Sequence, residues 1–177
     1  MVVGAMALLS GVAQAAGDEY GKHDLALIQA MQQSKLTLAD GIGQAVKWGV
    51  PLSARFDLDD GGRLSLVVVV AARPVATEVE NNEFRRLAGK PTKGWQPRAS
   101  TVREVPLVAR AAQQAAILAM SPLSLANIAV RAQRKGTPYT IAPDVRHGRP
   151  VFVVIVAENG KVSELTFDAL TGEPAKG

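Results

Sequence analysis

The sequence contains no cysteine, few aromatic residues and only two histidines. The absence of cysteine excludes disulfide bonds, thiolate nucleophiles and every metal or cluster site that needs a thiolate ligand. Aromatic residues are 5% of the 177 residues and apolar residues 47%, so the core must consist largely of Val, Leu, Ile and Ala. Charged residues are 20%, which predicts a packed globule rather than a disordered chain. The net charge of +4 slightly favours anionic partners.

The first sixteen residues carry no charge. Residues 2–12 have the composition of the apolar region of a secretory signal peptide, and Ala13-Gln14-Ala15 has the pattern of a cleavage site, although the usual preceding Lys/Arg segment is missing. We therefore expect a signal peptide at residues 1–16 and a periplasmic or secreted location. The alternative is an N-terminal membrane anchor, but the segment is short for a span and contains Gly, Ser and Gln.

The most informative feature of the chain is an internal repeat at a spacing of 87 residues. Residues 36–39 and 123–126 share Leu-x-Leu-Ala. Further matches follow without a gap: Gly49 with Gly136, Pro51 with Pro138, Asp57 with Asp144, Gly61 with Gly148, Val67 with Val154, and Val69 with Val156. Residues 84–91 and 167–174 share F-x-x-L-x-G-x-P at a spacing of 83. Self-similarity of this kind indicates two copies of one structural unit, and burial arguments favour copies that share apolar surface.

Copy one is predicted to contain two helices and three antiparallel strands. We expect helices at residues 19–33 and 38–48, strands at residues 54–58, 64–70 and 75–79, and a closing turn at residues 87–91. Thr37 is a suitable N-cap for the second helix, whereas Gly49 and Pro51 end it. Asp60-Gly61 offers the residues of a tight turn between the first two strands.

Copy two is predicted to follow the same plan, so that the fold is α+β. We expect a helix at residues 105–119, a helix that begins after Ser124, and strands at residues 140–145, 151–157 and 162–167. His147-Gly148 and Asn159-Gly160 are expected to form the turns between these strands. The first helix has an apolar stripe of Leu107, Val108, Ala111, Ala112, Ala115 and Leu118.

These patterns divide the chain into four parts. They are a signal peptide (1–16), a first repeat (17–91), a basic linker (92–104) and a second repeat (105–177).

Copy two contains a capped helix, a Gly-Pro break, a hairpin, an apolar strand, an Asn-Gly turn and the closing sequence from Phe167 to Pro174. Together these features resemble a PepSY domain, and copy one resembles a degenerate member with Arg85-Arg86 in place of Asp168-Ala169. The resemblance implies a small exported or membrane-tethered bacterial module that restrains peptidases and has no catalytic residues and no cofactor. It also implies that the tail residues shape a turn; they are Phe167, Asp168, Thr171 and Gly172.

Other candidate sites are weakly supported. The run Asp57-Leu58-Asp59-Asp60-Gly61-Gly62 begins like a calcium loop, but its fifth position is a glycine and its twelfth is Val68. We interpret the aspartates as the wet face of a strand that runs into a turn. His23 and His147 are too dispersed for a zinc site, and the nucleophile motif G-x-S-x-G is absent. We therefore expect no metal, no cofactor and no enzymatic activity.

Residues 85–103 contain basic residues and no acidic residue. The candidate contacts with an anionic partner are Arg85, Arg86, Lys90, Lys93, Trp95 and Arg98. One interpretation is a surface for lipid headgroups or an acidic polymer, with membrane contact that is peripheral. The favoured interpretation is a solvated linker whose tryptophan packs on copy one. Export argues against nucleic acid as a ligand.

The sequence thus leads to two functional hypotheses. The first is a non-catalytic exported protein-binding module that contacts or restrains a peptidase or another envelope protein, through an exposed β-edge or a groove between the copies. The alternative is a structural or sensory envelope module that binds a small ligand between the two repeats. A hydrolase ranks last, because no candidate nucleophile can be named.

Overall fold

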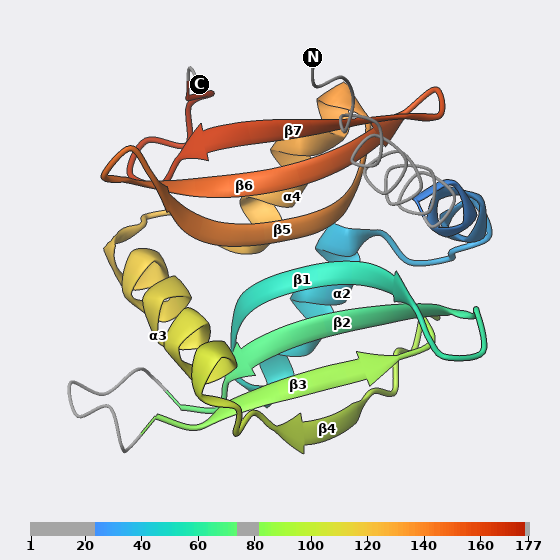
Figure 1. The fold of residues 1–177 in the computed structure, drawn as a ribbon, viewed down its shortest axis with the longest axis horizontal. Coiled ribbons are helices and arrows are strands. Elements are labelled where there is room, and N and C mark those ends of the chain that lie inside the picture. The colour runs from blue at the N-terminus through green and yellow to red at the C-terminus, as the bar shows by residue number, and fades with distance from the viewer. Residues whose placement is uncertain (1–23, 74–81, 176–177) are drawn as a thin grey trace, which may run out of the picture.

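The structure is a computed structural model that describes residues 24–73 and 82–175 (Figure 1). The expected signal peptide at residues 1–16 and the expected strand at residues 75–79 lie outside the described residues.

The fold is α+β and is organised around one antiparallel sheet. The described strands form a seven-stranded sheet in the order β4-β3-β2-β1-β5-β6-β7. They are β1 (Val50–Leu58), β2 (Leu64–Ala71), β3 (Phe84–Gly89), β4 (Arg98–Thr101), β5 (Thr137–Arg146), β6 (Arg149–Glu158) and β7 (Lys161–Asp168). Strands β1 and β5 lie side by side at the middle of the sheet and join its two halves (Figure 1).

Helices cover both faces of the sheet. Helices α2 (Leu38–Ala45) and α4 (Leu125–Ala132) pack against each other behind it, and α3 (Val105–Met120) crosses the opposite face (Figure 1). Short 3-10 turns, η1 (Val46–Trp48) and η3 (Gln133–Lys135), follow α2 and α4. Residues 24–31 form a further helix. In the part of the chain that the structure describes, no single helix has the length and apolar composition of a membrane span, although α3 and the helix after it, at 85° to each other, would qualify as a bent pair.

The succession of helix, 3-10 turn and three antiparallel strands occurs twice, and its local details recur at the spacing of 87. The predicted cap at Thr37 is confirmed: its hydroxyl accepts a hydrogen bond from the N–H of Asp40, and the Asp40 carboxylate accepts one in return. Ser124 and Asn127 form the same capping box. Each box satisfies N–H groups that the first helical turn leaves unpaired.

The entry into each sheet half also recurs. Gly49 (φ 145°) and Gly136 (φ 149°) follow the two 3-10 turns, and a Cβ at either position would approach a carbonyl of the neighbouring strand. A β-bulge follows each glycine, between Pro51 and Ser53 in β1 and between residues 138 and 140 in β5. Proline is tolerated at such positions because a bulge needs no ladder hydrogen bond there.

The first hairpin differs from its counterpart by one residue, so the prediction of an Asp60-Gly61 turn was wrong in detail. Its loop has three residues, 60–62, whereas His147-Gly148 forms a two-residue loop as predicted. Gly62 (φ 69°), not Gly61, adopts the left-handed conformation. Because the spacing falls to 86 beyond this loop, Val67 corresponds to Val153 and not to Val154.

The described residues contain a strand, β3, that the sequence analysis did not predict. Strand β3 pairs with β2 from Phe84 opposite Ala71 to Gly89 opposite Leu66. Residues 87–91 are therefore not a closing turn, because Leu87 is buried in the sheet opposite Val68. The two F-x-x-L-x-G-x-P motifs do not mark equivalent positions, since Phe84 begins its strand and the phenylalanine of the second motif stands near the end of β7.

The predicted basic linker at residues 92–104 is also wrong, because it contains β4, an edge strand of the sheet. Trp95 is fully buried (0% exposed), and its ring meets that of Trp48 edge-on at 5.8 Å between centroids. The indole N–H donates to the Gly89 carbonyl (3.2 Å), and the Trp95 backbone N–H donates to the Gln44 side chain (3.1 Å). These contacts fix the segment to α2 and β3.

The apolar core has two parts. The main cluster lies between the sheet and the pair α2 and α4 and includes Phe56, Ile128 and Phe152. A smaller cluster lies between the first sheet half and α3; its buried residues are Leu52, Ala71, Phe84, Ala111 and Ala115. The helix predicted at residues 105–119 is confirmed.

The predicted apolar stripe of α3 is correct only in part. Leu107 is 45% exposed, whereas Gln114, which the prediction left outside the stripe, is only 5% exposed. Gln114 follows Ala111 and precedes Ala115, both of them buried on the sheet. The helix therefore directs one amide side chain toward the sheet.

Candidate binding site beneath helix α3

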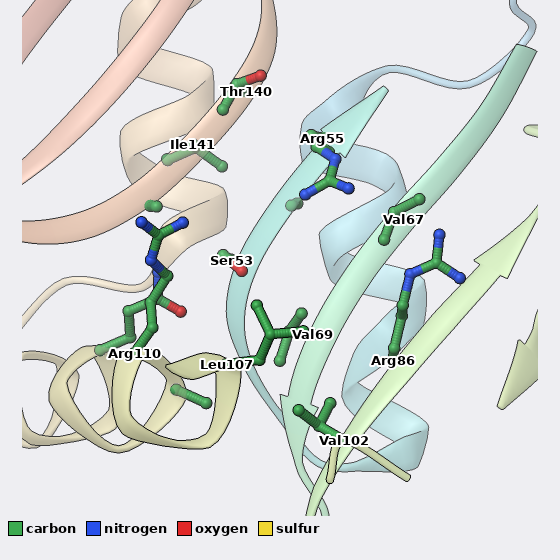
Figure 2. A pocket seen from close by; sticks show the side chains of 14 residues that line it. Ser53, Arg55, Val67, Val69, Arg86, Val102, Leu107, Arg110, Thr140 and Ile141 are labelled. Atoms are coloured by element: carbon green, nitrogen blue, oxygen red, sulfur yellow. The ribbon is translucent and has the colours of Figure 1, made fainter. Parts of the chain in front are cut away.

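A pocket of about 200 Å³ lies beneath α3, where the two halves of the sheet meet (Figure 2). Strands β1, β2, β3 and β5 form its floor, and α3 forms a wall. Val67, Val69, Val102 and Leu107 supply the apolar part of its lining, and Ser53 and Thr140 supply two hydroxyl groups.

The pocket opens where the ladder between the two halves stops. Strands β1 and β5 pair at Ala54 with Ile141 and at Arg55 with Thr140. Ala54 and Ile141 are 87 residues apart, so they are counterparts that pair with each other. The same symmetry would pair Ser53 with Ala142, but the ladder does not include that pair, and both residues line the pocket.

Local sequence explains why the ladder stops there. The next residue of β5 is Pro143, which has no N–H to donate. The bulge next to Ser53 affects the pairing of β1 with β2, and β5 has an equivalent bulge next to Thr140, so the bulges do not account for the missing pair. The floor therefore splits between the strands directly beneath α3.

Three arginines from three elements surround the pocket, and its lining contains no acidic residue. Arg55 comes from β1, Arg86 from β3 and Arg110 from α3. Figure 2 shows Arg110 rising from α3 toward the strand that carries Thr140, with Arg55 and Arg86 on the other side. Arg55 bonds to Asp57 at 3.1 Å, whereas no described residue forms a salt bridge with Arg86 or Arg110. The pocket is thus a positively charged hollow whose cations are only partly neutralised.

Gln114 provides an unpaired polar group inside this hollow. No described residue forms a hydrogen bond with its amide, although the residue is only 5% exposed. No fully buried side-chain nitrogen or oxygen among these residues lacks a partner. The Gln114 amide must therefore reach the open volume of the pocket that the residue lines.

The six candidate residues of the basic segment do not form one surface. Arg85 and Arg86 are neighbours on β3 and point to opposite faces of the sheet. Arg85 pairs with Glu83 at 2.8 Å, whereas Arg86 lines the pocket beneath α3. Trp95 belongs to the core.

The other three basic residues lie elsewhere. Lys90 and Arg98 line a separate hollow beside the first hairpin. Lys93 is exposed, and its carbonyl accepts a hydrogen bond from Gln44 at 3.0 Å. The structure thus places Arg86 in the lining of one pocket with Arg55 and Arg110, two residues that the charge pattern did not single out.

The acidic turn uses its carboxylate within the turn itself. Asp59 Oδ1 accepts from the backbone N–H groups of Gly61 and Arg63, both at 2.9 Å, and Oδ2 accepts from the Arg63 side chain. These hydrogen bonds, that from the Arg63 backbone first, hold the pKa of Asp59 below its ordinary value. Among the described residues, no group of three His, Asp or Glu side chains is placed to hold a metal ion.

The closing tail forms a turn, as predicted. Asp168 Oδ1 accepts from the N–H groups of Thr171 (3.0 Å) and Leu170 (2.9 Å), which lower the pKa of Asp168. Gly172 adopts φ 71°, and its carbonyl accepts from Arg131 of α4 at 2.7 Å. The turn is thereby attached to the helix layer.

Strand β7 forms one edge of the sheet and is only half covered. The Ala175 N–H donates to the Thr166 carbonyl at 2.8 Å, so the tail runs along the second half of β7. Residues 161–164 are exposed, with Val162 at 43%, and pair only with β6 in the described part of the chain. An open strand edge of this kind accepts an extended chain.

No protein-family model matches the sequence, and neither does any curated protein. Among solved structures, the chain is similar to that of a candidate lipoprotein from Clostridium difficile 630. The two chains are 11% identical, the match covers 83% of this chain and 95% of the other, and the TM-score is 0.40. A TM-score of that size does not establish a common fold.

Proposed function

We propose that the protein is a non-catalytic binding module of the bacterial envelope and that its ligand site is the pocket beneath α3. The observation that supports this proposal is the charged hollow between the two halves of the sheet, into which the buried Gln114 presents an unpaired amide. Ligand sites are commonly concave, mostly apolar and equipped with a few polar groups. The envelope location follows from the expected signal peptide and the PepSY resemblance, which are themselves proposals.

The lining favours recognition over turnover. It contains arginine, amide and hydroxyl groups but no His, Asp, Glu or Lys to accept a proton at neutral pH. Arginine stays protonated in proteins and does not serve as a base at that pH. Ser53 and Thr140 therefore have no partner in the lining that would activate them as nucleophiles.

A pocket-filling variant tests this proposal. A ligand present at 100 times its Kd adds about 2.7 kcal/mol to the free energy of unfolding, which a thermal-shift screen detects. Ala142→Phe should abolish this shift because the ring occupies the pocket, and Ala99→Phe on the exposed strand β4 serves as the matched control. Equal ligand-induced shifts in both variants would place the binding site elsewhere.

A second function, contact with a peptidase or another envelope protein, is favoured by the open half of β7. Because the Thr166 carbonyl faces outward, the alternation of the ladder directs the backbone groups of Val162 and Glu164 outward as well. An extended partner segment would add there as an eighth strand. The PepSY resemblance supplies the peptidase as the class of partner.

The edge is tested by removing one outward N–H. Glu164→Pro should weaken binding of an envelope peptidase and relieve any inhibition of it, while Glu164→Thr keeps the N–H and should bind normally. Equal binding by both variants would exclude strand addition at this edge.

A further inference from the structure

We infer that the pocket beneath α3 binds a small anion with two or more charged oxygens, of the phosphate or polycarboxylate class. This inference rests on the proposed binding function of the pocket and adds the chemistry of its ligand. Three arginines, one each from β1, β3 and α3, line a hollow whose lining contains no acidic residue.

The first argument is the geometry of the donors. Guanidinium groups present planar sets of N–H donors that match carboxylate and phosphate oxygens in pairs. Arg86 and Arg110 have no salt bridge among the described residues, and Arg55 uses its Nε for Asp57 while its two NH2 groups stay free. Donors on three sides favour a ligand with several anionic oxygens over a single carboxylate.

The second argument is the neutral part of the lining. The Gln114 amide offers two further donors where no protein acceptor meets them. The Ser53 and Thr140 hydroxyls lie across the split in the floor. Val67 and Val69 keep part of the pocket apolar, and a lower local dielectric strengthens hydrogen bonds to a charged ligand.

The third argument is size. A volume of about 200 Å³ is smaller than the roughly 300–1,000 Å³ of typical sites for drug-sized molecules. At about 30 Å³ for each water molecule, it corresponds to roughly seven waters. Phosphate or a short polycarboxylate fits this volume, whereas a lipid chain or a folded peptide does not.

The test is calorimetric titration of the full chain with inorganic phosphate and with citrate, at constant ionic strength set by chloride. Arg86→Gln and Arg110→Gln should each weaken binding about 10- to 150-fold, the range for one hydrogen bond to a charged group. Arg103→Gln makes the same change in charge at an exposed position outside the pocket and should leave the affinity unchanged. Preference for phosphate or for citrate identifies which of the two sources of anionic oxygens the pocket takes.

Gln114→Leu provides a second measurement that does not remove charge. It should reduce anion affinity while raising the melting temperature of the free protein, because an unpaired amide no longer faces a partly apolar hollow. Retained cooperative unfolding in all variants shows that they fold.

The outcomes separate this inference from the proposed function. Equal anion affinity in Arg110→Gln and Arg103→Gln, or no binding of either anion, overturns the inference. If the thermal-shift screen then finds a neutral ligand whose effect Ala142→Phe abolishes, the proposed function stands with a different ligand class. If no ligand of any charge binds, the proposed function fails as well.

Discussion

Replacing Trp95 with alanine removes a fully buried indole from a segment that sequence patterning assigns to a linker. Truncation of a buried aromatic side chain to alanine costs about 3–5 kcal/mol, since the surrounding core collapses only partly. The lost contacts include the edge-on contact with Trp48 and the hydrogen bond to the Gly89 carbonyl. If Trp95 lay on the surface of a linker, its replacement with alanine would lower the free energy of unfolding by less than about 1 kcal/mol.

The assay is urea unfolding followed by far-ultraviolet circular dichroism, because the substitution itself changes the fluorescence. Trp95→Phe keeps most of the apolar ring and loses the donor to Gly89, so we expect an intermediate loss of about 1–3 kcal/mol. Lys93→Ala, an exposed change in the same segment, should stay within about 0.5 kcal/mol of the parent. A loss below about 1 kcal/mol for Trp95→Ala would refute the burial of this segment and, with it, the placement of β4.

Three further predictions concern turns and caps. Gly172→Ala should lower the free energy of unfolding more than Gly148→Ala does. Both glycines have φ above 70°, a conformation that costs other residues about 1–2 kcal/mol. Only at Gly172 would a Cβ also meet neighbouring side chains. Thr37→Ala and Ser124→Ala should each lower the free energy of unfolding, measured with urea, by about 0.5–2 kcal/mol. The two losses should be similar, because the two capping boxes have the same hydrogen bonds. The lowered pKa of Asp168 means that its stabilisation is complete above the pKa of the unfolded carboxyl and is lost as pH falls through the folded pKa. Stability measured from neutral to acidic pH should therefore fall less steeply in Asp168→Asn, and identical profiles would contradict this assignment.

Local sequence signals predicted the elements that local interactions specify. The caps at Thr37 and Ser124, the helix at residues 105–119 and the turns at His147-Gly148 and Asn159-Gly160 are all present. Each depends on residues within a few positions of one another, such as a hydroxyl that accepts from an N–H three residues later. Short-range chemistry of this kind can be identified without knowledge of the rest of the fold.

Elements set by distant partners were predicted less well. The position of β3 is set by its pairing with β2. The local sequence of Phe84–Gly89 does not predict that pairing. The shared F-x-x-L-x-G-x-P motif misled because apolar and glycine positions occur in strands and turns alike. Trp95 was assigned to a linker because the charges around it are exposed, although its own side chain is core.

The candidate site was predicted only in part, because it also depends on contacts between distant elements. Charge alone singled out Arg86, but Arg55 and Arg110 come from separate elements that only the sheet order brings to one place. One signal was available in the sequence: Gln114 lies three residues after Ala111 and four after Arg110 in α3, which puts an amide on the helix face that meets the sheet.

The repeat makes that amide informative, because the chain contains its counterpart. Ser34 and Ser121 follow their helices and form the same side-chain hydrogen bonds, with the backbone of residues 36 and 123, at a spacing of 87 residues. In that correspondence Gln114 replaces Leu27, and both are buried. Leu27 belongs to the main core cluster, whereas Ala111 and Ala115 beside Gln114 belong to the smaller cluster beneath α3.

The Gln114 amide stays accessible from the pocket, because no fully buried side-chain nitrogen or oxygen among the described residues lacks a partner. The two halves also differ at the ladder, which forms the pair of Arg55 and Thr140 but not its symmetric equivalent. Gln114, Ser53 and Ala142 all line the pocket beneath α3, which Arg55, Arg86 and Arg110 line as well. If the proposed binding function holds, a ligand in this pocket accounts for the common location of both departures.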